Sequence, residues 1–167
     1  MLVLVSFLFP MLVAGNSAPT TALPKEWQGS WQGTLKIRNS KDKESSVAIG
    51  LEIQPIKATR HFTWKIIYGE GDKKSVRDYK LVPIKEMPGR FHIDEGNGIL
   101  LDARLVDNVI YSQFRVGDAM LTARYELRGT ALLFEITSAK ASAKKIGKGM
   151  IQGYLIQVVQ SAVMKKK

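Results

Sequence analysis

Hydrophobic and polar side chains alternate with a period of two through most of the chain, which is the pattern of half-buried β-strands. The alternation is clearest from Arg90 to Ser138, where short segments are separated by pairs of Gly, Asn and Asp. Such pairs readily adopt the positive φ that tight hairpin turns require. The segments are RFHIDE, ILLDARLV, VIYSQFRV, AMLTARYELR and ALLFEITS. We therefore predict an antiparallel meander in this part of the chain.

Further strands are predicted on both sides of the meander, again from alternation. They cover residues 31–39, 47–53, 61–68, 76–84 and 150–163. Pro83 favours an edge, a bulge or the end of a strand at that point. The Ala- and Lys-rich segment 139–149 has helical leanings, so we predict a short helix or loop there, before the last strand. About ten strands at this spacing are typical of an all-β fold, a sandwich or an antiparallel up-and-down β-barrel, and we favour the barrel.

The two-residue turns predict which side chains share a face of the sheet, because residues flanking such a turn lie opposite each other. The flanking pairs are Val106–Val109, Val116–Ala119 and Arg128–Ala131. Together they place the apolar side chains of the meander on one face, while charged side chains occupy the other. Small inward residues such as Ala103, Ser112 and Ala123 leave two possibilities open, a ligand-sized cavity or a filled core.

The ends of the chain differ in composition from the predicted barrel. Residues 1–18 begin with an uncharged apolar run and predict a signal peptide, although no basic leader precedes the run and an uncleaved anchor is the alternative. We interpret residues 19–25 as a linker, 26–164 as the barrel and 165–167 as a basic tail. The expected location is therefore exported, periplasmic or secreted. The chain has no Cys, which excludes disulfides and thiolate chemistry.

The formal net charge is +10, and several of the lysines are clustered. Such a balance favours contact with an anionic envelope surface, and the alternative is a set of solvated loops. The candidate contact residues are Lys140, Lys144, Lys145 and Lys148. Export makes nucleic acid an unexpected partner, and we expect a monomer.

The tripeptide Gly29-Ser30-Trp31 resembles the G-x-W element that opens the first strand of lipocalins. With the predicted strand order, the chain resembles the calycin group of lipocalins and fatty-acid-binding proteins. Other segments, Tyr68-Gly-Glu-Gly among them, are similar to bacterial exported lipocalin-like proteins of unassigned function. The resemblance implies a barrel whose end is closed by Trp31 beneath a late-strand Arg. Arg124 or Arg128 would take that place, but the predicted register directs both outward.

Candidate chemistry is sparse in this sequence. Some barrel relatives bind haem through a His, but His61 and His92 are both predicted to face solvent. We therefore expect no haem, no metal site and no other cofactor. The serines lack a nucleophile-elbow context, and neither His is placed to act as a base. Paired acids at Asp94 and Glu95 are typical of solvated turns. The sequence predicts a protein that is not an enzyme.

The predicted function is binding of a small ligand inside the barrel. The candidate ligand-binding residues are Phe62, Trp64, Tyr68, Phe114, Leu121, Tyr125 and Phe134. The inner face offers no clear Arg, which favours a neutral or weakly polar apolar ligand. The opposite prediction would follow if the register slipped by one residue and moved residues such as Arg104 and Arg124 inside. The alternative function is a filled barrel that acts through its basic surface as a cell-envelope interaction module.

Overall fold

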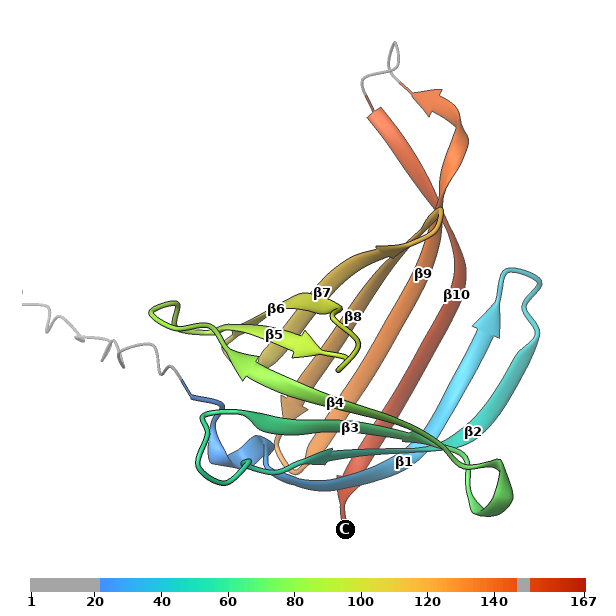
Figure 1. The fold of residues 1–167 in the computed structure, drawn as a ribbon. Helices are drawn as coiled ribbons and strands as arrows, with labels where there is room; N and C mark the ends of the chain where they lie inside the picture. The colour runs from blue at the N-terminus through green and yellow to red at the C-terminus, as the bar shows by residue number, and fades with distance from the viewer. Residues whose placement is uncertain (1–21, 147–150) are drawn as a thin grey trace, which may run out of the picture.

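The computed structural model describes residues 22–146 and 151–167. In these ranges the chain forms a closed, all-antiparallel barrel in which every strand pairs with its sequence neighbours and the last strand pairs with the first (Figure 1). The strands are β1 (Gly29–Asn39), β2 (Glu44–Ile53), β3 (Phe62–Tyr68), β4 (Ser75–Pro83), β5 (Arg90–Asp94), β6 (Leu100–Val106), β7 (Val109–Val116), β8 (Ala119–Arg128), β9 (Ala131–Ile146) and β10 (Ile151–Lys166). The predicted fold class, an all-β up-and-down barrel of ten strands, is confirmed.

The register follows the turns that the sequence marks. Val106 pairs with Val109, and Val116 with Ala119, as the two-residue turns predict. The pairing of Arg128 with Ala131 continues the same parity into β9. Leu81, Phe91, Ile110 and Leu132 are consequently buried, because alternate residues of each strand point into one shared core. The alternative register, shifted by one residue, is therefore wrong.

One end of the barrel is closed by tryptophans from the start of the described chain. A 3₁₀-helix, Lys25–Trp27, precedes β1, and both Trp27 and Trp31 are buried. The Trp31 indole Nε1 donates a hydrogen bond of 2.9 Å to the Trp27 carbonyl oxygen. The ammonium of Lys166 lies 4.9 Å from the centre of the Trp31 ring. The cation beside this indole is therefore a lysine of the last strand, and Arg124 and Arg128 do not take that place.

Some expected boundaries need correction, and others lie outside the described residues. The expected signal, 1–18, is outside them, as are residues 19–21 of the expected linker. Leu23 is buried in the core, so the described part of that linker belongs to the folded unit. The expected basic tail, 165–167, is also structured: Lys165 and Lys166 extend β10, and the backbone N–H of Lys167 donates to the Ser30 carbonyl at 2.9 Å.

The expected helix or loop at 139–149 is wrong over its described part, because β9 continues to Ile146. Ala and Lys favour a helix locally, but the backbone of this segment pairs with β10 instead, at Ala139–Ile156 and Lys145–Gln152. Residues 147–149 of the prediction lie outside the described chain. Across the described residues, no helix has both the length and the apolar character needed to span a membrane.

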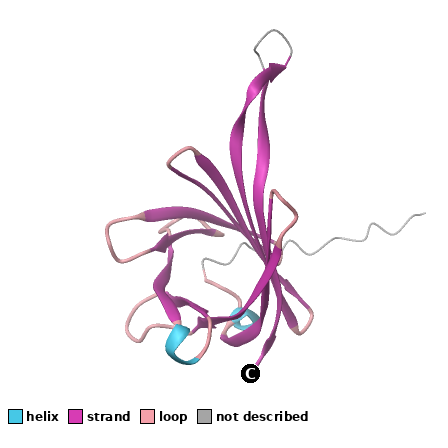
Figure 2. Cartoon of the chain, turned by 90° about the vertical axis from the view of Figure 1, so that its right-hand side faces the viewer, coloured by secondary structure: helices cyan, strands magenta, loops and turns pink. Residues whose placement is uncertain are grey.

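The last hairpin extends beyond the wall of the barrel. Pairing of β8 with β9 stops at Ala119–Lys140, and pairing of β1 with β10 stops at Asn39–Val158. Within the described structure, residues 141–146 of β9 therefore pair with β10 and not with β8, and residues 151–157 of β10 pair with β9 and not with β1. We call these residues the arm. Figures 1 and 2 show the arm projecting away from the other strands.

Candidate functional site

An internal cavity of about 360 Å³ lies between the barrel walls. The cavity extends from the aromatic core toward the end of the barrel opposite Trp31. It reaches Tyr68 and Val116, which are the last residues of β3 and β7. We call that end the mouth. The lining residues are Trp64, Ile66, Tyr68, Arg77, Tyr79, Ile93, Glu95, Leu101, Ser112, Phe114, Val116, Leu121, Ala123, Tyr125, Phe134 and Ile136.

Packed aromatic rings form the inner end of the cavity. Tyr125 of β8 meets Trp64 of β3 edge to face, with ring centres 4.9 Å apart and planes inclined by 75°. On its other side Tyr125 contacts Phe134 of β9 at 5.1 Å between ring centres. These edge-to-face and tilted contacts are favourable geometries for aromatic pairs, and they hold a rigid apolar wall across three strands.

The structure brings together most of the candidate ligand-binding residues predicted from the sequence. Six of them line this cavity: Trp64, Tyr68, Phe114, Leu121, Tyr125 and Phe134. Phe62 has the same inward parity but does not line it. It is the first residue of β3, so it lies toward the Trp31 end, buried in the core. That the six residues bind a ligand stays a prediction.

The mouth carries polar side chains that sequence reasoning missed. Arg77 and Tyr79 of β4 line the cavity together with Glu95, which follows β5. The expectation of no inward Arg is therefore wrong. The sequence pattern of β4 did not assign which of its residues face inward. The turn after β3 decides this, because it pairs Ser75 with the inward Tyr68. That pairing places the odd-numbered residues of β4 inward, and an inward count from Ser75 would have found Arg77.

The tyrosines of the cavity are held in their neutral form by burial. Burial raises the pKa of Tyr125 and of Tyr68, because a phenolate loses its hydration inside the barrel. The pKa of Tyr79 is raised by burial and then by the neighbouring Glu95 carboxylate. At neutral pH all three hydroxyls keep their protons and can donate hydrogen bonds to a ligand.

Two other polar groups lie on the inner wall. The Ser112 hydroxyl is buried and donates a hydrogen bond of 2.7 Å to the Asp102 carbonyl oxygen, so it presents an acceptor to the cavity. The buried indole N–H of Trp64 makes no well-formed hydrogen bond in the described structure. Its weak interaction with the Tyr125 hydroxyl lowers the pKa of that tyrosine less than burial raises it. This poorly satisfied buried donor could also bond to an acceptor on a ligand.

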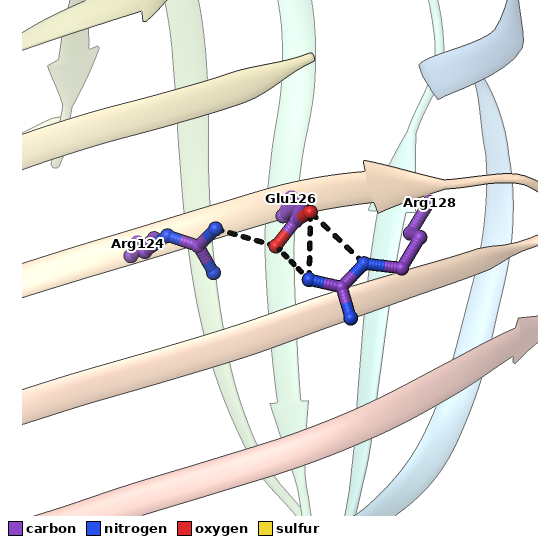
Figure 3. Close-up of polar contacts among 3 residues, drawn as sticks. All are labelled: Arg124, Glu126 and Arg128. Carbon is purple, nitrogen blue, oxygen red and sulfur yellow. Dashed lines mark hydrogen bonds and ion pairs between the residues drawn. The ribbon is translucent and has the colours of Figure 1, made fainter.

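A larger depression, of about 610 Å³, lies on the outside of the wall, across β1, β10, β9 and β8. It is open to solvent and is bordered by charged residues, including Lys36, Arg124 and Glu135. Beside it, Arg124 and Arg128 both bind the carboxylate of Glu126 (Figure 3), with Arg128 Nη2 at 2.9 Å from Glu126 Oε1. The inner cavity is the stronger candidate site because apolar walls enclose it.

Neither histidine lies on the cavity. His92 lies on the outer face of β5, where its Nε2 is 3.3 Å from Oδ1 of Asp102 on β6. His61 precedes β3 and borders a shallow surface site with Thr59 and Arg60. In the ranges 22–146 and 151–167, no three His, Asp or Glu side chains form a group able to hold a metal ion.

Comparison of the sequence with protein-family models and with curated proteins finds no match. Solved structures, however, share the fold. An S-type phycobiliprotein lyase, CPES from Guillardia theta, superposes with a TM-score of 0.61 at 9% identity, covering 86% of this chain and 89% of that chain. A protein of the DUF3598 family from Nostoc punctiforme gives a TM-score of 0.60 at 12% identity, covering 91% of this chain and 53% of that one. The closed ten-strand barrel thus fits a calycin-like fold.

The expectation that this protein is not an enzyme needs correction. A protein with the same fold is a lyase, so the barrel architecture does not argue against catalysis. The expectation was based on a missing nucleophile elbow, which is specific to one class of hydrolases, and on a missing His base, although carboxylates and tyrosines can also transfer protons. An inward Arg, three neutral tyrosines and a carboxylate at one cavity supply other polar groups.

Proposed function

We propose that the barrel binds a small molecule with an apolar body in its interior and a weakly polar group near the mouth. The observation that supports this most is the cavity of about 360 Å³ between Trp64, Phe114 and Tyr125. Its volume lies within the range of roughly 300–1,000 Å³ typical of small-molecule sites. A cavity of this kind favours interior binding over the alternative of a filled barrel that acts only through its surface.

The distribution of polar groups supports the weakly polar end of the ligand. The deep wall is aromatic and aliphatic, whereas Arg77, Tyr79 and Glu95 gather at the mouth. The carboxylate of Glu95 offsets the charge of the inward Arg77, so the corrected lining still favours a ligand without a full charge. Arg77 is exposed and makes no ion pair within the described residues, so it remains hydrated when the cavity is empty. A ligand inserted with its apolar part first would leave its polar group beside these side chains and in partial contact with water.

Filling the cavity should weaken binding of a neutral fluorescent probe, N-phenyl-1-naphthylamine. In Ala123→Met the longer side chain would enter the space that Ala123 borders on the inner face of β8. The matched control is Thr122→Met, which adds a similar side chain on the opposite face of the same strand. We expect titration of probe fluorescence to show a loss of affinity of about tenfold or more for Ala123→Met and little change for the control.

Two further measurements protect this test against misfolding. Leu121→Trp fills the cavity nearer the mouth, where the site is only half-buried and tolerates a larger side chain. Tyr125→Ala enlarges the cavity and removes its central ring, and should abolish capture of a host ligand detected as excess mass by native mass spectrometry. Circular dichroism shows whether each filled variant is folded. If both folded variants bound the probe as tightly as wild type, interior binding would be refuted.

A further inference from the structure

The arm exposes large apolar side chains that the barrel does not need. Tyr154, Leu155 and Ile156 are 52%, 57% and 58% exposed. They pair in unbroken register with Ala141, Lys140 and Ala139, so successive side chains point to opposite faces of the ribbon. Apolar residues therefore cover both faces of the arm near its base. A two-stranded ribbon with unpaired edges is marginally stable in water, and these exposed side chains favour an occupant.

The charge of this region has one sign. From Ile136 to Val163 the sequence contains four lysines and no Asp or Glu. Lys144 and Lys145 belong to the described arm, and Lys140 lies at its base, 3.0 Å from Asp118 of the neighbouring turn. Lys148, the fourth residue of the predicted anionic contact, lies outside the described residues. The arm thus combines exposed apolar groups with excess positive charge.

The arm rises from the same end of the barrel as the mouth of the cavity. Its base adjoins the turn between Val116 and Ala119, and Val116 both lines the cavity and is 60% exposed. Ile99 of the turn between β5 and β6, and Leu100 at the start of β6, are 46% and 56% exposed. Exposed apolar side chains therefore occur both on the arm and on the neighbouring turns at the mouth end of the barrel.

We propose that the arm docks on an anionic lipid membrane, with Leu155 and Ile156 entering the interface and the positive charge of this Lys-rich segment attracted to the phosphates. A lipid surface offers apolar depth and negative charge together, and the arm presents the complement of both. An anionic polysaccharide or nucleic acid would use the lysines but leave the apolar residues without a role. A second copy would bring like-charged arms together, which is unfavourable. Docking would bring the mouth of the cavity to the lipid surface.

The arm can be tested with a local fluorescence probe in the full chain. The described tryptophans, Trp27, Trp31 and Trp64, are 0%, 1% and 0% exposed, so a new exposed indole can be distinguished from them. Leu155→Trp introduces it in the arm. Met87→Trp is the matched control, since Met87 is 55% exposed in the loop between β4 and β5 at the opposite end of the barrel. The lipid is phosphatidylglycerol mixed with brominated phosphatidylcholine, which quenches indoles that enter the interface.

We expect the vesicles to quench Leu155→Trp emission strongly and Met87→Trp emission little. Adding Lys144→Gln and Lys145→Gln should weaken the binding by about tenfold, whereas Lys57→Gln and Arg60→Gln at the closed end should not. Equal quenching of the two indoles would overturn the proposal, as would equal binding to vesicles of phosphatidylcholine alone. Self-association that Leu155→Ser abolishes, measured by analytical ultracentrifugation, would assign the arm to a second copy instead. Binding of N-phenyl-1-naphthylamine in the cavity is measured in a separate experiment. The proposal of interior binding therefore does not depend on the outcome for the arm.

Discussion

The carboxylate of Glu126 lies between two guanidiniums on the outer face of β8. Hydrogen bonds from Arg124 and Arg128 lower the pKa of Glu126 below its ordinary value of 4.5. The Glu126 side chain is only 14% exposed, so the pair of arginines shields it more than an ordinary surface carboxylate. Arg124 and Arg128 both point outward from β8, so their positive charges lie near each other. The Glu126 carboxylate between them is their common partner (Figure 3).

Removing this carboxylate should make the stability of the protein depend less on pH in the acid range. The folded pKa of Glu126 is lowered, so its stabilising contribution is present above its ordinary pKa of 4.5 and is lost as pH falls through the folded value. We expect Glu126→Gln to be less stable than wild type at neutral pH. The difference in melting temperature should shrink as the pH falls below 4.5 and through the lowered folded pKa of Glu126, where wild type binds the proton.

The measurement is thermal unfolding by circular dichroism from neutral to acid pH. Glu70→Gln is the control, because Glu70 is an exposed carboxylate that forms no ion pair in the described chain. A difference between wild type and Glu126→Gln that is constant across this pH range would show that Glu126 acts through packing and not through its charge.

At the scale of single residues, prediction succeeded wherever a turn fixed the parity. Tyr125 and Phe134 were placed inside because Arg128 pairs with Ala131. Arg77 was missed because alternation in β4 is weak: Val76 and Val82 lie on the outer face while Arg77 lies on the inner one. Apolar parity cannot identify the inner face when the mouth of a barrel tolerates a charged side chain.

Among the elements, β9 and β10 stand apart because each exceeds the height of the wall. Each strand has 16 residues, whereas the neighbouring β8 and β1 have 10 and 11. The local composition at the end of β9 favours a helix, but this segment forms a strand because it pairs with β10 across the hairpin. Local propensity is a weak guide when a long-range partner supplies the backbone hydrogen bonds.

Hydrogen exchange should divide these two strands into a protected half and an exposed half. Residues 152–157 pair with β9 but lie beyond the last pairing of β10 with β1, while Gln160 to Met164 pair with β9 and lie beside β1. We expect the arm amides to exchange about tenfold faster or more, which corresponds to roughly 1.4 kcal/mol less opening free energy. Mass spectrometry of peptic fragments measures this. Equal protection in both halves would mean that something covers the arm in solution, such as a second copy.

For the whole molecule, closure depends on the pairing of the last strand with the first. Met164 is buried beside Gly33, and Lys166 pairs with Trp31 and covers its ring. The space there is tight, because a Cβ on Gly33 would lie 2.5 Å from the Val163 carbonyl oxygen. The end of β10 therefore completes both the hydrogen-bonded wall and the plug at the closed end.

Deleting residues 164–167 should destabilise the barrel more than Met164→Ala does. The substitution removes buried methylene groups and should cost about 2–5 kcal/mol. The deletion also removes the cation over Trp31 and the last pairings between β1 and β10, so its cost should be larger. Urea unfolding followed by tryptophan fluorescence measures both. Lys165→Gln combined with Lys167→Gln controls for the loss of charge, and equal costs for deletion and substitution would argue against closure as the reason.

The alternation and the turn residues alone determined the strand number, the antiparallel order and the inner face of the meander, because these depend on neighbours joined by short turns. Tertiary structure decided what depends on distant strands. Closure placed Lys166 over Trp31, the barrel radius left a cavity at Trp64 and Tyr125, and β4 brought Arg77 to its mouth. The excess length of β9 and β10 produced the arm, since strands continue for as long as each finds a partner. These features arise from packing in three dimensions, which no local pattern records.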